Sequence, residues 1–137
     1  MISTRGRYAL RVLADLAEHR QDGAYIPMRE VAERQEISLK YMEQILPILT
    51  KAGLIEGVPG KGGGYRLCRE PERYTAGEIL RLTEGDLAPV ACLAKGSQPC
   101  ARAAECRTLP LWQRYMEVTN AFFDSVTLAE LIRQNPD

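Results

Sequence analysis

The sequence predicts a mainly α-helical protein with one small β-hairpin, in which a winged helix-turn-helix is followed by a long C-terminal helix. Helical patterns with capping signals and a glycine-rich hairpin signal predict the winged part, and an aromatic-rich helical pattern predicts the long helix. The chain has 137 residues, of which 45% are hydrophobic and 26% are charged. This balance is typical of a single globular unit with its own core.

Two helices open the predicted fold. Ser3 or Thr4 can cap the first, over residues 5–19, and its wide apolar arc predicts that most of this helix is buried. Pro27 suits the first turn of the second helix, over residues 28–35. Opposite charges four positions apart should form exposed ion pairs on this second helix: Arg29 with Glu33, and Glu30 with Arg34.

A third helix is the candidate recognition helix. Ser38 caps its start, Gly53 closes it as a left-handed residue, and one apolar face recurs at helical spacing through Met42, Ile45, Leu46 and Leu49. A strand is expected over residues 54–58 and its partner over 65–68, joined by the glycine-rich loop 59–64. Helix, helix, recognition helix and hairpin in this order is the winged helix-turn-helix plan.

The rest of the chain should be helical around one irregular segment. Two capping boxes, Thr75 with Glu78 and Thr127 with Glu130, open a fourth helix and a short last helix. The long helix begins near residues 108–110. We therefore expect three parts: a winged helix-turn-helix domain at 1–75, a linker helix with a cysteine-containing loop at 76–108, and the long helix with the closing short helix at 109–137.

The exposed face of the third helix carries residues that can read DNA. Lys40 can bond phosphate or guanine, Gln44 can bond adenine through two hydrogen bonds, and Glu43 can accept from the cytosine amino group. A solvated helix face would carry the same residue types. The pattern alone therefore leaves both interpretations open.

The hairpin loop is the second candidate for DNA contact. Lys61 precedes three consecutive glycines, Gly62, Gly63 and Gly64, whose bare backbone can approach a phosphate or a narrow minor groove. Arg66 can add to this charge. A nucleotide-binding P-loop is excluded, because no Lys-Ser/Thr pair follows and the loop leads into a strand. A plain flexible hairpin is the alternative.

Three cysteines stand close together as Cys92-x7-Cys100-x5-Cys106. This spacing favours an iron–sulfur cluster over zinc, because structural zinc usually takes four protein ligands in close pairs. Thiols that act without a metal are the third interpretation. A fourth cluster ligand could be Glu105, a residue of a partner subunit or a small molecule. Cys68, on the returning strand, is expected to be a buried apolar residue.

The long helix carries an apolar stripe at coiled-coil-like spacing, which is too apolar to face water. Core packing is one interpretation of the stripe. Pairing with a second copy is favoured, because the winged helix already has a core and symmetric dimers suit palindromic DNA sites. The expected dimer interface consists of Trp112, Tyr115, Met116, Thr119, Phe122, Phe123 and Val126.

Composition excludes other classes of protein. No stretch approaches the ~20 apolar residues of a membrane span, and the N-terminus lacks the shape of a signal peptide, so a cytoplasmic location without membrane contact is expected. The formal net charge is zero, so a DNA partner must be argued from local geometry. The chain shows no nucleophile–base pattern and has a single histidine, which argues against an enzyme.

Together these features resemble the Rrf2 family of bacterial transcription regulators over essentially the whole chain. The resemblance lies in TRGRYAL at 4–10, ISLKYMEQIL at 37–46, Leu54-Ile55 leading into GKGGGY at 60–65, and TLAEL at 127–131. Within the family, the chain is most similar to the iron–sulfur branches, called IscR-like and NsrR-like.

The resemblance implies a homodimer that pairs through the long helix and binds double-stranded DNA through the winged helix. It implies a cluster held by Cys92, Cys100 and Cys106, whose state alters DNA affinity or sequence choice. It also extends the expected DNA contacts to Arg5, Arg7, Ser38, Leu39, Tyr41 and Tyr65.

Leu109 stands where the IscR type carries a histidine ligand, so the fourth ligand and the choice between [4Fe-4S] and [2Fe-2S] stay open. Two other functions also stay open. One is a cluster-free regulator that senses redox or sulfur state through its thiols. The other is a winged-helix protein-interaction module that does not bind DNA.

Overall fold

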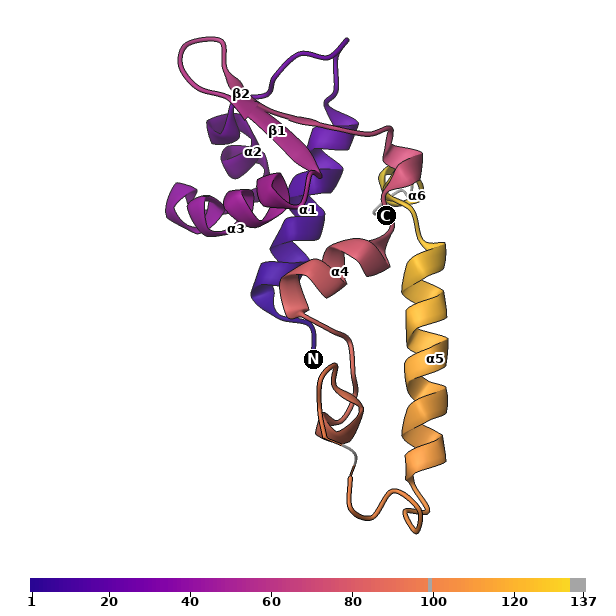
Figure 1. Ribbon diagram of the computed structural model, residues 1–137. Coiled ribbons are helices and arrows are strands. Elements are labelled where there is room, and N and C mark those ends of the chain that lie inside the picture. Colours follow the sequence, from indigo (N-terminus) through magenta and orange to yellow (C-terminus); the bar gives the residue numbers. More distant parts are fainter. Residues whose placement is uncertain (99, 134–137) are drawn as a thin grey trace.

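The computed structural model describes residues 1–98 and 100–133 and shows a winged helix-turn-helix with a long helix beside it (Figure 1). The winged part comprises α1 (Thr4–Glu18), α2 (Met28–Gln35), α3 (Leu39–Lys51), β1 (Ile55–Val58) and β2 (Gly64–Leu67). It is followed by the 3₁₀ helix η1 (Pro71–Arg73), α4 (Ala76–Glu84), the 3₁₀ helix η2 (Ala91–Leu93), α5 (Leu109–Ser125) and α6 (Leu128–Arg133). The predicted fold class is confirmed.

Four helices begin where hydroxyl side chains cap them, as the sequence predicts. Each hydroxyl accepts a hydrogen bond of 3.1–3.2 Å from the backbone N–H three residues later. The caps are Ser3, Ser38, Thr75 and Thr127. The side chain of Glu78 bonds Arg69 at 2.9 Å instead of reaching back to close the predicted capping box.

The core is built around α1, which contacts α2, α3, α4, α6 and β2. Val12, Leu13 and Leu16 are completely buried on this helix. Leu128 of α6 joins the same cluster, so the closing helix packs on the winged part rather than extending the long helix. Each such buried leucine contributes roughly 1.5–3 kcal/mol through removal of apolar surface from water.

The hairpin is anchored to the strand-like residue that precedes α2. Tyr65 and Ile26 exchange two backbone hydrogen bonds, of 2.8 and 2.9 Å. A Cβ on Gly64 would collide with the Ile26 carbonyl, and one on Gly63 would collide with the carbonyl of Val58. Gly63 is therefore required by the close approach of backbone within the hairpin, and Gly64 by the close approach of the hairpin to Ile26.

The buried carboxylate of Asp15 ties α1 to the end of α2. It is 1% exposed and accepts hydrogen bonds from Arg34 at 2.7 and 3.0 Å and from the Gln35 amide at 2.9 Å. The hydrogen bond to Asp15 raises the pKa of Arg34 above its usual value. The predicted Glu30–Arg34 pair is wrong, because Arg34 turns inward to satisfy this buried charge.

The second predicted ion pair on α2, Arg29 with Glu33, does not form among the described residues either. Both side chains are exposed there. Exposed pairs at this spacing gain only about 0.2–0.5 kcal/mol, which is too little to hold two long side chains in place.

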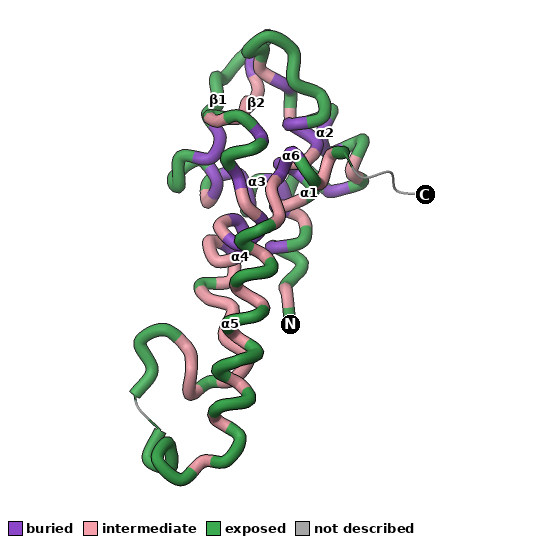
Figure 2. Tube along the Cα trace, turned by 90° about the vertical axis from the view of Figure 1, so that its right-hand side faces the viewer, coloured by how far each residue is buried: buried purple, intermediate pink, exposed green. Residues whose placement is uncertain are grey.

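The long helix α5 lies beside α4 and has no fully buried residue (Figure 2). Arg81 of α4 holds it through hydrogen bonds to Asn120 and Asp124. The cysteine-bearing segment lies at the end of α5 that is remote from the hairpin (Figure 1). Each described helix is too short or too polar to cross a lipid bilayer.

Replacing Asp15 with asparagine should lower the free energy of unfolding by about 2–3 kcal/mol, because Arg34 then loses its charged partner in a buried setting. Urea unfolding followed by circular dichroism measures the change. Glu18→Gln, on the exposed face of the same helix, is the matched control and should change the value by less than about 0.5 kcal/mol. Equal stability of Asp15→Asn and the unaltered protein would contradict this role.

Candidate nucleic-acid interface and cysteine segment

The recognition helix presents its N-terminal half to solvent. Ser38, Leu39, Lys40, Glu43 and Gln44 are all exposed. The opposite face of α3 is buried through its apolar residues, so the helix cannot rotate without losing its core contacts. The three residues that can reach base edges, Lys40, Glu43 and Gln44, therefore share one accessible face.

Tyr41 lies differently from the other predicted contact residues. It is half-buried and packs edge-on against Tyr8 of α1, with ring centroids 5.2 Å apart. The guanidinium of Arg11 lies over the Tyr8 ring, 5.0 Å from its centroid. Tyr41 thus fixes the start of α3 on α1, and direct contact of its ring with DNA stays a prediction.

The first turn of α1 lies beside the start of α3. Arg5 and Tyr41 line the same hollow, which is bounded by Thr83 and Glu84 of α4. Arg5 and Arg7 are both exposed, and Arg7 donates a 3.1 Å hydrogen bond to the Thr4 hydroxyl. These arginines are positioned to extend the charged surface next to the recognition helix.

Only some of the predicted DNA-contact residues of the wing are exposed. Lys61 and Gly62 are exposed at the tip, whereas Gly63 is buried and Gly64 is half-buried. The half-buried ring of Tyr65 covers Gly57 so closely that a Cβ there would collide with it. The accessible part of the wing is thus its tip, and the buried glycines have a structural reason.

Arg66 does not extend toward the tip of the wing. Its guanidinium donates to Glu56 at 2.6 Å and to the Gly23 carbonyl at 2.7 Å, and it lies over the ring of Tyr25 at 4.4 Å. Arg66 therefore braces the hairpin against the turn after α1. The positive charge of Arg66 therefore lies at the base of the hairpin and not at the tip of the wing.

The three clustered cysteines all lie on the segment between α4 and α5. Cys100 is exposed, and Cys92 and Cys106 are partly exposed. Within residues 1–98 and 100–133, no three His, Cys, Asp or Glu side chains lie together as a metal ion requires. The thiol donors fit the chemistry of an iron–sulfur cluster, but their positions do not form a preassembled cage for it.

A carboxylate organises the start of this segment. Asp86 accepts hydrogen bonds from the backbone N–H of Ala88 at 3.0 Å and of Lys95 at 2.9 Å. These two hydrogen bonds lower the pKa of Asp86 below its usual range. The turn that carries Cys92 is thereby fastened to Asp86, the second residue after the end of α4.

Two cysteines differ in acidity. Hydrogen bonds from the hydroxyl and the backbone N–H of Thr108 lower the pKa of the Cys106 thiol, which lies just before α5. Cys68 is exposed, so its predicted burial is wrong: it follows the last residue of β2, Leu67, at the edge of the hairpin. Partial desolvation of its sulfur and the nearby Glu56 raise the pKa of Cys68.

The long helix exposes an apolar stripe that differs in part from the predicted one. Tyr115 and Phe122 are 53% and 60% exposed, and Leu111 and Val118, which sequence reasoning missed, are 58% and 62% exposed. These four residues recur at i, i+4, i+7 and i+11, a helical spacing that could have identified them. The other predicted interface residues are half-buried within the chain itself: Trp112, Met116, Thr119, Phe123 and Val126.

The chain is similar in sequence to known transcriptional regulators. Residues 2–134 match the model of the Rrf2 family, described as an iron-dependent transcriptional regulator. The HTH-type transcriptional regulator IscR of Aliivibrio salmonicida is 35% identical over 134 residues, which cover 98% of this chain and 78% of that protein.

Two solved structures resemble the fold closely. CymR, the global cysteine regulator of B. subtilis, superposes with a TM-score of 0.77 at 33% identity and covers 96% of this chain and 95% of that one. IscR of T. potens superposes with a TM-score of 0.74 at 32% identity and covers 97% and 86%. These relatives are named as regulators, which agrees with the expectation that the chain is not an enzyme.

In the metal-free protein at pH 8, iodoacetamide should alkylate Cys106 faster than Cys68, because the thiolate is the nucleophile and the two pKa values are shifted in opposite directions. Peptide mass spectrometry measures the two rates. The difference should shrink as the pH rises, when both thiols ionise. Thr108→Val removes the hydroxyl and should slow the reaction of Cys106, whereas equal rates at pH 8 would contradict the assignment.

Proposed function

Because the chain belongs to the Rrf2 family of transcriptional regulators, we propose that it is a dimeric DNA-binding regulator whose operator binding responds to an iron–sulfur cluster. Membership of this family implies DNA binding and transcription regulation. The observation that carries the proposal is the exposed face of α3 beside the wing, on a chain that also bears a three-cysteine segment.

The DNA-binding step uses the two exposed elements of the winged part. The N-terminal half of α3 enters the major groove, where Lys40, Glu43 and Gln44 reach phosphates and base edges. Lys61 at the tip of the wing contacts the adjacent backbone or minor groove. The acidic Glu43 repels phosphate, so it contributes to sequence choice rather than to affinity.

Dimerisation covers the stripe of Leu111, Tyr115, Val118 and Phe122. Four large apolar side chains, each more than half exposed along one helix face, are unfavourable in water and mark an interaction surface. A second copy of α5 supplies a matching stripe under two-fold symmetry. Two recognition helices related in this way suit a palindromic operator.

Cys92, Cys100 and Cys106 would hold the cluster, which supplies a redox-active iron centre when bound. Relatives named IscR and the iron-dependent description of the family support this assignment. The cysteine side chains are accessible on a connecting segment, so the segment can close around a central group without disturbing the core. The fourth ligand stays open.

A short route connects the cysteine segment to the DNA-binding surface. Asp86 fastens the segment, and two residues earlier Glu84 accepts hydrogen bonds from the backbone N–H and hydroxyl of Ser3, at 2.8 and 2.7 Å. Ser3 is the cap of α1, whose first turn carries Arg5 and Arg7. A change in the segment can therefore alter the position of these arginines by linkage between two conformations.

A cluster-free thiol sensor is the second candidate function. The hydrogen bonds from Thr108 that lower the pKa of Cys106 favour it, because a thiolate is the form that oxidants attack. The similarity to CymR, named as a global cysteine regulator, is in line with it. The iron content of protein purified without oxygen distinguishes the two functions.

Lys40→Ala should weaken DNA binding and reduce the slope of log affinity against log salt by about one unit, because one phosphate contact is lost. Fluorescence anisotropy with a genomic fragment selected by the unaltered protein measures both quantities. Lys51→Ala, at the far end of α3, is the control and should leave both nearly unchanged. Unaltered affinity and slope in Lys40→Ala would remove this residue from the interface.

Cys100→Ala should abolish iron and sulfide binding and leave a folded dimer, because the residue lies on an exposed connecting segment. Iron and sulfide are counted per chain after purification without oxygen, and gel filtration gives the oligomeric state. Cys68→Ala is the control and should keep a full load. A full iron and sulfide load in Cys100→Ala would contradict the ligand assignment.

A further inference from the structure

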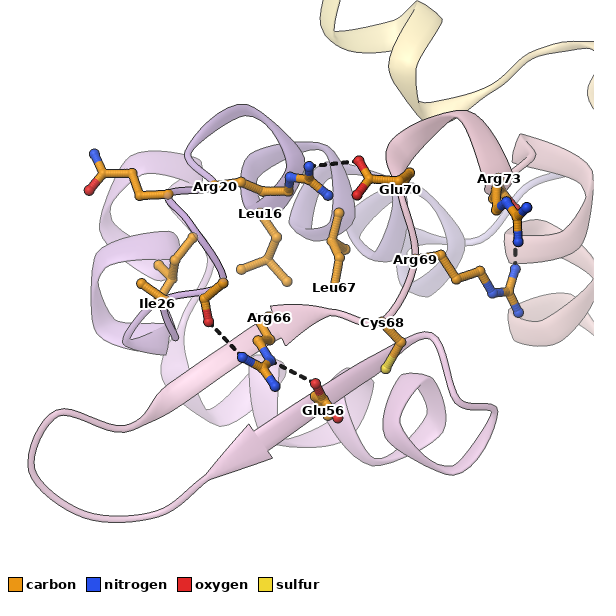
Figure 3. A pocket seen from close by; sticks show the side chains of 13 residues that line it. Leu16, Arg20, Ile26, Glu56, Arg66, Leu67, Cys68, Arg69, Glu70 and Arg73 are labelled. Atoms are coloured by element: carbon orange, nitrogen blue, oxygen red, sulfur yellow. Dashed lines mark hydrogen bonds and ion pairs between the residues drawn. The ribbon is translucent and has the colours of Figure 1, made fainter.

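A cavity of about 570 Å³ lies between the end of α1, the turn after it, β2 and the segment that leads into η1 (Figure 3). Its floor is apolar and consists of Leu16, Ile26 and Leu67. Its volume falls within the range of small-molecule sites. It lies away from the exposed face of α3 and from the cysteine segment, so the proposed function does not use it.

Positive charge dominates the walls of this cavity. Four arginines line it, Arg20, Arg66, Arg69 and Arg73, against two glutamates, Glu56 and Glu70. Arg20 lies in the turn after α1, Arg66 in β2, Arg69 in the segment after β2 and Arg73 in η1. Figure 3 shows Arg20 and Arg66 on opposite sides of Leu16 and Leu67, with Arg69 and Arg73 next to each other at one end. Guanidinium groups are suited to bind carboxylate and phosphate through paired hydrogen bonds.

The existing ion pairs leave room for an anion to compete. Arg20 bonds Glu70 at 2.8 Å, but the Glu70 side chain is 67% exposed. Pairs of this kind contribute little, because water screens them. Arg73 makes no side-chain ion pair with any residue in 1–98 or 100–133. Two of the four guanidinium groups can thus turn to a ligand at small cost.

Arg66 is already held in position by protein groups. It is fixed by the Glu56 carboxylate, the Gly23 carbonyl and the ring of Tyr25, so one edge of the cavity is preorganised. Glu56 offsets the charge of Arg66, so the net positive charge of the cavity comes from the other arginines. Arg69 is likewise fixed by Glu78 and lies 5.1 Å from the centroid of the Tyr74 ring.

We propose that this cavity binds a small organic anion, a molecule with one carboxylate or phosphate group on a short apolar body. The anionic group lies among the guanidinium groups, and the apolar body lies on the floor. The ligand would bridge α1 and β2, and β2 leads directly from the wing. Its binding would therefore stiffen the wing and change DNA affinity independently of the cysteine segment.

The test is isothermal titration calorimetry on the full chain at low salt with four probes: phenyl phosphate, benzoate, inorganic phosphate and acetate. We expect saturable binding of phenyl phosphate or benzoate, at least about tenfold tighter than that of the matching anion without an apolar body. Whichever of the two binds identifies the anionic group. Arg20→Gln and Arg73→Gln should each weaken binding by about tenfold, whereas Arg29→Gln, on the exposed face of α2, should not.

A second measurement locates the bound probe. Cys68 lines the cavity, so the bound probe should slow its alkylation by iodoacetamide and leave that of Cys92 unchanged. Absence of saturable binding, or unchanged affinity in both Arg20→Gln and Arg73→Gln, would overturn the proposal. So would a loss of DNA affinity and salt slope in these variants without small-anion binding, because the arginines would then contact the DNA backbone.

Discussion

A single buried tyrosine, Tyr74, connects the base of the hairpin in the winged part to the closing helix α6. The Tyr74 hydroxyl donates to the Leu54 carbonyl at 2.6 Å and accepts from the backbone N–H groups of Cys68 and Arg69 at 3.0 and 3.1 Å. Its own carbonyl accepts from Leu128 at 2.9 Å. Burial raises the pKa of Tyr74, so the hydroxyl keeps its proton and can donate. The side chain of Tyr74 therefore holds the base of the hairpin, and its main-chain carbonyl holds the start of the closing helix.

The segment from Thr75 to Thr127 begins and ends beside Tyr74, so its two ends lie next to each other in the structure. The two threonines form an antiparallel bridge, and the Ala76 N–H donates to the Val126 carbonyl at 2.9 Å. The segment with the three clustered cysteines lies at the end of this part of the chain that is remote from the hairpin (Figure 1). In the proposed function, a change in this segment reaches the first turn of α1 through the end of α4, where Glu84 holds Ser3.

Most of the fold could be predicted from the sequence, because capping residues and apolar spacing within a few positions decide where the helices begin and which face is buried. The hydroxyl caps and the third helix with its buried face are decided by neighbours within a few positions. Sequence reasoning missed the bond from Asp15 to Arg34, because a buried carboxylate outcompeted an exposed partner on the same helix. It also missed the arginine-lined cavity, whose residues are far apart in the chain and meet only in three dimensions.

The exposed apolar stripe of α5 also could not be predicted fully from the sequence. Helical spacing identified an apolar helix, but the pattern is wide enough to serve two faces. Only the packing of α5 on α4 decides that Met116 lines a hollow together with Leu82 and that Val118 is exposed to solvent. The residues proposed to contact DNA are exposed, so the apolar pattern that marks buried positions in the sequence cannot identify them.

The most direct test of cluster-dependent operator binding compares DNA binding by two forms of one preparation. Protein purified without oxygen is divided, one half keeps its iron and sulfide, and the other is stripped with a chelator. Both halves are titrated against the same selected genomic fragments at several salt concentrations. We predict salt-dependent binding by both forms, with a difference in affinity or in the fragments preferred. Identical affinity and preference in the loaded and stripped forms would contradict it.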